Sequence, residues 1–183
     1  MKVIKTSEAA LEEASKVLNS GGVVVIPTDT VYGLAAHPDI KDAVDRLYTI
    51  KARAEQKPIA LLASSCESAR KYIGEKGVAV AKPYWPGALT IVSQGEGVRV
   101  PDHSWTLSLI ARCGGALRVT SANMSGQRPA LDAMEALKDV GLSADLIVDD
   151  GVSPGGKASS VWLVDSSSIK VLRPGPIPLN DKL

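Results

Sequence analysis

Hydrophobic positions along this chain follow two patterns, one typical of amphipathic helices and one of buried strands. Apolar side chains spaced by three and four positions predict a helix over residues 7–19, which Gly21 and Gly22 would end. The β-branched run at 23–26 predicts a buried strand that Pro27 ends. Similar patterns predict helices over 38–51, from 64–65 toward 72, over 105–113 and over 132–140, and strands over 59–63, 89–92, 117–120, 146–148, 161–164 and 170–172.

This alternation of helices and strands predicts an α/β fold. The last two strands lie close enough in sequence to form a hairpin across residues 166–168, so we expect a mixed sheet and not a purely parallel one. Asp132 and Glu135 have the spacing of a capping box at the start of the last helix. A length of 183 residues fits one domain over 1–183, with an irregular tail from about 174 to 183.

Composition narrows the class of protein. Hydrophobic residues make up 45% and charged residues 22%, the balance of a soluble globular protein. The net charge of +1 indicates neither a nucleic-acid-binding nor a membrane-binding surface. No apolar run approaches the roughly 20 residues that cross a bilayer, and the first residues lack the apolar core of a signal peptide. We therefore expect a cytoplasmic protein with no membrane partner.

The sequence gives little indication of a metal site or of a redox-active cysteine pair. Cys66 and Cys113 lie far apart without a CxxC pattern, and His37 and His103 are the two histidines. We expect two reduced thiols and no metal held by protein ligands.

A group of cations follows the second predicted helix. Lys51, Arg53 and Lys57 lie within seven residues. The helix dipole also favours cations at a helix C-terminus, so these side chains could simply stabilise the end of the helix. Three together before a strand are better suited to a phosphate clamp, because arginine can grip two phosphate oxygens at once. No GxxxxGK[ST] loop is present, so a nucleotide would be held without a P-loop.

Polar residues follow several predicted strands, where α/β sheets place ligand groups. Residues 27–34, PTDTVYGL, combine hydroxyls with a carboxylate, although spacing alone favours a turn from a strand to a helix. Ser121 and Asn123 could bind one ligand together or form an ordinary turn. The glycine pair at 155–156 could bring backbone N–H groups close to an anion, although such a pair is more often an ordinary turn. Four further arginines are each expected to be surface charges when taken alone: Arg99, Arg118, Arg128 and Arg173.

Together these segments resemble the YrdC/Sua5 family of threonylcarbamoyl-adenylate synthases. The family's motifs occur in order from residue 27 to 177: PTDTVYGL, LYTIKAR followed by KPI, WPGALTIV, VRVPDH, VTSANMSG, DLIVDDG and VLRPGPI. The resemblance implies the short, single-domain form, a YrdC-like twisted mixed sheet flanked by helices with a concave, positively charged cavity.

The resemblance also implies an activity. ATP, L-threonine and bicarbonate would react to threonylcarbamoyl-AMP, pyrophosphate and water, and a separate tRNA threonylcarbamoyltransferase complex would use the product for the t6A modification at position 37. A carbamate attacking the α-phosphorus needs positioning and charge neutralisation more than a side-chain nucleophile. We accordingly expect no catalytic side chain of that kind, and Mg2+ held mainly by phosphate oxygens.

Site residues follow from the matched motifs. The positions that match the family's nucleotide-binding motifs are Lys51, Arg53, Ser121, Asn123 and Arg173. The cluster of cations adds Lys57 to this group. The group that matches threonine-binding positions is Thr30, Arg99 and Ser159. Three positions depart from the family pattern. Ala54 replaces a proline, Ser160 replaces a threonine, and Leu62 falls near a histidine that contacts threonine in many relatives.

Two other functions remain open at this point. The family fold binds double-stranded RNA in some members, so direct tRNA or double-stranded RNA binding is the first alternative. A net charge of +1 and the absence of Phe argue against it. The second alternative is a paralogue that carbamoylates another substrate.

Overall fold

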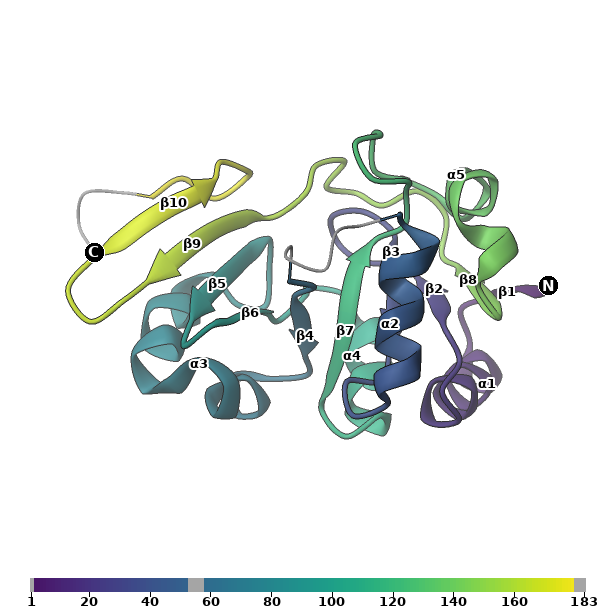
Figure 1. Ribbon diagram of the computed structural model, residues 1–183, viewed down its shortest axis with the longest axis horizontal. Helices are drawn as coiled ribbons and strands as arrows, with labels where there is room; N and C mark the ends of the chain where they lie inside the picture. Colours follow the sequence, from purple (N-terminus) through teal and green to yellow (C-terminus); the bar gives the residue numbers. More distant parts are fainter. Residues whose placement is uncertain (1, 53–57, 180–183) are drawn as a thin grey trace.

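The computed structural model describes residues 2–52 and 58–179. A ten-stranded sheet in the order β1-β8-β2-β3-β7-β4-β6-β5-β9-β10 runs through the molecule, with β1 and β10 at its opposite ends (Figure 1). The strands are β1 Lys2–Lys5, β2 Val24–Ile26, β3 Gly33–Ala36, β4 Leu61–Ala63, β5 Leu89–Ser93, β6 Glu96–Arg99, β7 Ala116–Ser121, β8 Leu146–Asp149, β9 Ser160–Val164 and β10 Ile169–Arg173.

The sheet is mixed, as the sequence predicts. The pairs β1–β8, β8–β2, β4–β6 and β5–β9 are parallel, and the others are antiparallel. The predicted hairpin of β9 and β10 is confirmed, and the amide of Asp165 donates to the carbonyl oxygen of Ser168 at its turn.

The helices are α1 Glu8–Asn19, α2 Lys41–Ile50, α3 Cys66–Ala81, α4 Ser104–Arg112 and α5 Ala133–Asp139, with short 3-10 turns at Lys82–Tyr84 and Gly141–Ser143. Side-chain caps begin several of them. The Ser7 and Ser65 hydroxyls accept from the backbone N–H groups of Ala10 and Ser68. No helix among the described residues is long and apolar enough to cross a membrane.

Helices cover both faces of the sheet. Leu34 packs with α2 and α5 and Leu61 packs with α3, on one face. The next residues along the same strands, Ala35 and Leu62, belong to a core with α1 and α4 on the opposite face. Figure 1 shows α2 in front of the sheet and α4 behind β7. The period-two alternation of strand side chains therefore sorts the sequence into two buried layers.

Several sequence predictions need correction. The segment after β2 leads into a second strand, β3, and not into a helix, so the predicted strand-to-helix turn is wrong. Strands β1, β3 and β6 were not predicted, because β1 and β6 are short and partly polar and β3 reads GLAA without a β-branched residue. Helix α3 continues past residue 72 to Ala81, through a non-helical Gly74 at φ 67°.

The predicted capping box forms only in half. The Asp132 carboxylate accepts from the amide of Glu135 at 2.7 Å, as expected for an N-cap. The Glu135 carboxylate instead accepts from the amide of Leu131 at 2.8 Å and also pairs with Arg128. Asp132 therefore caps α5, and Glu135 holds the residue before it.

Replacement of a fully buried strand residue tests this packing. We expect Leu61→Ala to lower the free energy of unfolding by about 2–5 kcal/mol, since it removes buried methyl groups and leaves a cavity under α3. Urea denaturation measures the change. Leu142→Ala is the matched control at an exposed site and should stay within about 0.5 kcal/mol of the wild type. Equal effects at both positions would contradict the assigned core.

Candidate functional site

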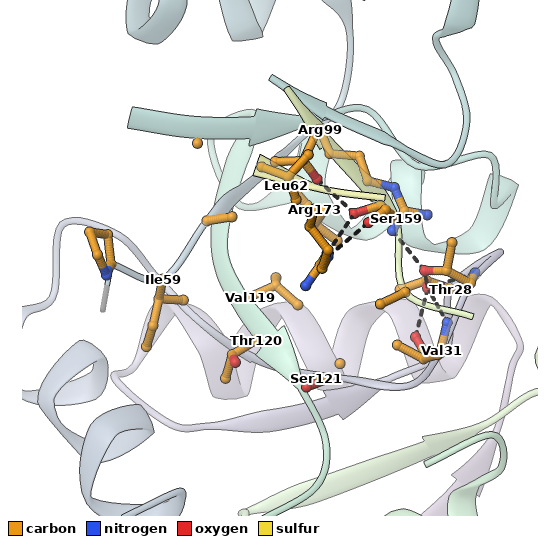
Figure 2. Close-up of a pocket in the computed structure, with 18 of the residues that line it drawn as sticks. Thr28, Val31, Ile59, Leu62, Arg99, Val119, Thr120, Ser121, Ser159 and Arg173 are labelled. Atoms are coloured by element: carbon orange, nitrogen blue, oxygen red, sulfur yellow. Dashed lines mark hydrogen bonds between the residues drawn. The ribbon is translucent and has the colours of Figure 1, made fainter. Parts of the chain in front are cut away.

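A cavity of about 430 Å3 lies on the sheet face that α1 and α4 partly cover. Side chains from five neighbouring strands reach it because alternate residues of β7, β4, β6, β5 and β9 point to this face. Its polar lining includes Thr28, Thr30, Thr90, Arg99, Thr120, Ser121, Ser159 and Arg173. Its apolar lining includes Ile59, Leu62, Val92, Val119, Val161 and Leu172. Figure 2 shows both kinds of side chain around one space.

Arg99, the last residue of β6, is held by three residues from two segments. Its Nε donates to the carbonyl oxygen of Gly87 at 2.9 Å, and its Nη1 donates to Thr30 Oγ1 at 2.7 Å. Its Nη2 forms an ion pair with Asp29. A guanidinium carries more N–H donors than these contacts use, so Arg99 can also bind an anion in the cavity.

Burial shapes the electrostatics of this arginine. The Arg99 side chain is 7% exposed, and burial lowers the pKa of its guanidinium. The charge of Arg173 acts in the same direction, whereas Asp29 opposes both. Arginine still keeps its charge at neutral pH. The site thus holds a fixed cation whose field is weakly screened.

Arg173 reaches the cavity from β10, at the far side of β9. Its Nε donates to the Ser159 carbonyl oxygen at 3.0 Å, and its Nη2 donates to Ser159 Oγ at 3.2 Å. Ser159 Oγ also lies 2.8 Å from Thr90 Oγ1. In Figure 2 the Arg173 side chain extends into the space between Ser159 and β7.

Lys51 lies at the C-terminal end of α2 and is 2% exposed. Its ammonium donates to the carbonyl oxygen of Ser121, to Ser121 Oγ at 3.3 Å and to Asn123 Oδ1 at 3.4 Å. The Asn123 amide nitrogen donates to the carbonyl oxygens of Met124 and Gln127, which orients its oxygen toward Lys51. The cation is thereby fixed behind Ser121, at the wall of the cavity.

The 27–34 segment joins β2 to β3 through a tight turn. Thr28 Oγ1 donates to the Val31 carbonyl oxygen at 2.7 Å and accepts from the amides of Thr30 and Val31. Gly155 packs against this turn, and its amide donates to the Asp29 carbonyl oxygen at 3.0 Å. A Cβ on Gly155 would lie 2.5 Å from that oxygen, so only glycine fits. The Gly155 N–H therefore holds the turn and not an anion.

Most of the sequence-predicted residues meet at this cavity. Five line it directly: Thr30, Arg99, Ser121, Ser159 and Arg173. Lys51 and Asn123 contact Ser121 from behind. Arg53 and Lys57, with the variant position Ala54, lie outside the described residues.

Of the positions that depart from the family pattern, Leu62 lies at the cavity and Ser160 does not line it. Leu62 lines the cavity and pairs in register with Arg99, so an apolar side chain stands beside the buried cation. Ser160 is fully buried, and its hydroxyl contacts the backbone of Ile177.

Several contacts near the site were not predicted from the sequence. The Asp29 carboxylate was a candidate for binding a ligand, but it pairs with Arg99, and the Gly87 carbonyl oxygen also accepts from Arg99. Arg118 was expected to be a surface charge, but it forms a two-point ion pair with Glu96 at 2.6 and 2.7 Å and donates to the Ile59 carbonyl oxygen. Arg128 does behave as a surface charge, with a side chain 70% exposed.

The chain is similar to known proteins over most of its length. The family model Sua5/YciO/YrdC, described as telomere recombination, matches residues 16–175. A protein of Bos taurus named threonylcarbamoyl-AMP synthase is 32% identical over 91% of this chain and 68% of its own length. A Vibrio cholerae protein of the same name is 31% identical over 90% of this chain and 97% of its own length.

Solved structures show the same fold. P. abyssi Sua5 complexed with L-threonine superposes with a TM-score of 0.89 and 29% identity, over 98% of this chain. The match covers 58% of the P. abyssi chain, so the present chain spans little more than half of that protein.

Removal of the carboxylate beside Arg99 should destabilise the folded protein. We expect Asp29→Ala to lower the free energy of unfolding by about 3 kcal/mol or more, since it leaves a buried guanidinium without its counter-charge. Urea denaturation at neutral pH provides the measurement. Glu12→Ala removes an exposed carboxylate from α1 and is the matched control. A loss at Asp29 no larger than at Glu12 would contradict the assigned ion pair.

Proposed function

This chain belongs to the Sua5/YciO/YrdC family, and we propose that it forms threonylcarbamoyl-AMP and pyrophosphate from ATP, L-threonine and bicarbonate. One observation carries the proposal. Residues from five separate segments that match the family's binding motifs converge on a single cavity: Thr30, Arg99, Ser121, Ser159 and Arg173. The relatives named threonylcarbamoyl-AMP synthase and the threonine-bound P. abyssi structure support this choice of substrates.

The nucleotide would bind toward β7 and β10. Lys51, Ser121 and Asn123 form one connected group at the end of β7, and Arg173 extends into the same cavity. Lysine supplies a compact charge and arginine a planar fork, two complementary ways of binding phosphate oxygens. We assign this group to ATP, together with Arg53 and Lys57.

Threonine would bind beside Arg99. A guanidinium fixed by Thr30 and Asp29 is suited to the amino acid's carboxylate, since arginine and carboxylate pair in a two-point geometry. Ser159 lines the same cavity, where it accepts from Arg173, and is a further hydrogen-bonding group. Leu62 offers an apolar contact for the substrate's methyl group.

The proposed reaction has two steps. The threonine amine attacks the carbon of bicarbonate, a C–N bond forms and water leaves, which gives a carbamate. A carbamate oxygen then attacks the α-phosphorus of ATP, and the bond from that phosphorus to the bridging oxygen breaks, so pyrophosphate leaves. The chain's role is to align the two substrates and to stabilise the negative charge that develops on the phosphates.

Mg2+ would enter with the triphosphate. Among the described residues, no group of three or more His, Cys, Asp or Glu side chains lies close enough to hold a metal ion. We propose a cation that keeps phosphate oxygens and water as ligands and takes few ligands from protein. Bound in this way, Mg2+ would neutralise charge on the leaving pyrophosphate. The product would pass to a tRNA threonylcarbamoyltransferase complex for the t6A modification.

Mass spectrometry of the product tests the reaction. The wild-type protein with ATP, threonine and bicarbonate should yield threonylcarbamoyl-AMP, and omission of threonine or bicarbonate should abolish it. Pyrophosphate release that needs neither of these substrates would contradict the proposal. Release that depends on another amino acid in place of threonine would indicate a different carbamoylation substrate.

A variant of the buried lysine tests the nucleotide group. Lys51→Ala should lower threonine-dependent pyrophosphate release by about a hundredfold or more, because a preorganised charge at the phosphates is lost. Lys41→Ala, at the exposed start of the same helix, is the matched control and should keep full activity. Thermal unfolding of both variants checks the fold. Full activity of a folded Lys51→Ala variant would remove Lys51 from the site.

A further inference from the structure

We propose that Ser160 is a positioning residue for Arg173. It ties the segment after β10 back onto β9 and so sets the Arg173 guanidinium in the cavity. The inference rests on the proposed function in one respect, namely that Arg173 contacts ATP. The family motifs mark position 160 only as a serine in place of a threonine, and Ser160 is not among the residues that line the cavity; its hydroxyl bonds to Ile177 instead.

The Ser160 hydroxyl makes two hydrogen bonds with one residue of the following segment. It donates to the carbonyl oxygen of Ile177 at 2.7 Å and accepts from the amide of Ile177 at 2.9 Å. Ser160 itself is fully buried at the start of β9. A buried hydroxyl that satisfies both a donor and an acceptor of one peptide segment fixes the position of that segment.

The segment packs closely at this point. A Cβ on Gly175 would lie 2.5 Å from the Ser160 amide nitrogen, so the backbone of 174–176 passes directly against β9. Beyond it, Ile177 and Leu179 pack on the core under α3. The chain after β10 is therefore fastened at Ser160, by contact and by hydrogen bonds.

Arg173 lies at the other end of the same turn. It is the last residue of β10, which is an edge strand that pairs with β9 alone and has an irregular register before Arg173. Its guanidinium contacts the Ser159 carbonyl and hydroxyl oxygens. The neighbouring residues Ser159 and Ser160 thus hold the two ends of one turn, Ser159 through the Arg173 side chain and Ser160 through the Ile177 backbone.

Loss of the Ser160 hydroxyl should release this turn. The Ile177 N–H and carbonyl groups would lose a shared partner, and the exposed edge strand would no longer fix the start of a long, flexible side chain. Because Arg173 is assigned to ATP, the effect should fall on ATP binding more than on threonine binding. We expect Ser160→Ala to weaken ATP binding about tenfold, with threonine binding changed less than about twofold.

Calorimetric titration of ATP and, separately, of threonine into each variant tests the proposal. Ser160→Thr keeps a hydroxyl at the same place and should bind ATP as the wild type does. Gly175→Ala pushes the same segment off β9 from the other side and should reproduce the ATP defect, even if Ser160→Ala fails to fold. Ser168→Ala removes a serine hydroxyl at the opposite end of the β9–β10 hairpin, where it contacts Asp165, and should leave both affinities unchanged.

A double variant separates positioning from a general structural effect. If Ser160 acts through Arg173, Ser160→Ala should add little to the loss of ATP affinity already caused by Arg173→Ala. Additive losses, or equal losses for ATP and threonine, would overturn the proposal, as would wild-type affinity in both Ser160→Ala and Gly175→Ala.

These outcomes are independent of turnover. A wild-type protein that binds ATP but forms no threonylcarbamoyl-AMP would contradict the proposed function, while the selective ATP defect would still support the role of Ser160. Product formation by the wild type, together with unchanged ATP affinity in both Ser160→Ala and Gly175→Ala, would contradict the inference alone.

Discussion

The antiparallel pairing of β7 with β3 on one side and β4 on the other joins the two halves of the sheet. The other features of the site depend on this pairing. It sets Val119 and Ser121 on the cavity side and brings β3 and β6 to either side of the same space. At the end of β7, the chain presents the oxygens of Ser121 and Asn123 to Lys51. A slip of one residue in either ladder would turn the cavity side chains to the opposite face.

Charge is fixed around the cavity before any substrate arrives. Arg99 is paired with Asp29 and bonded to Thr30 and Gly87, and Lys51 is surrounded by oxygens from β7 and the loop after it. Buried cations need such partners, since desolvation opposes the charged state. Groups fixed in this way require little rearrangement when a charged transition state forms. The contacts that stabilise these buried charges in the fold therefore also hold them in fixed positions for anionic substrates.

Much of the fold followed from the pattern of apolar residues, and its gaps have physical causes. The long periodic helix α1 and the short β-branched strand β2 were both predicted close to their observed bounds. Strand β3 was missed because GLAA carries no strand signal of its own; neighbours on both sides make it a strand. Arg118 was misjudged for a similar reason, since its partner Glu96 lies on a strand that the sequence did not predict.

The sequence by itself determined the α/β class, the mixed sheet and the residue types that can bind phosphate and carboxylate groups. It identified those residues through motifs, one segment at a time. Only the tertiary structure decided which of them share a cavity, that Asp29 pairs with Arg99, and that the Ser160 hydroxyl contacts the segment after β10. The reason is that these relations join residues far apart in the chain, and strand order and register, which no local pattern encodes, determine which of them meet.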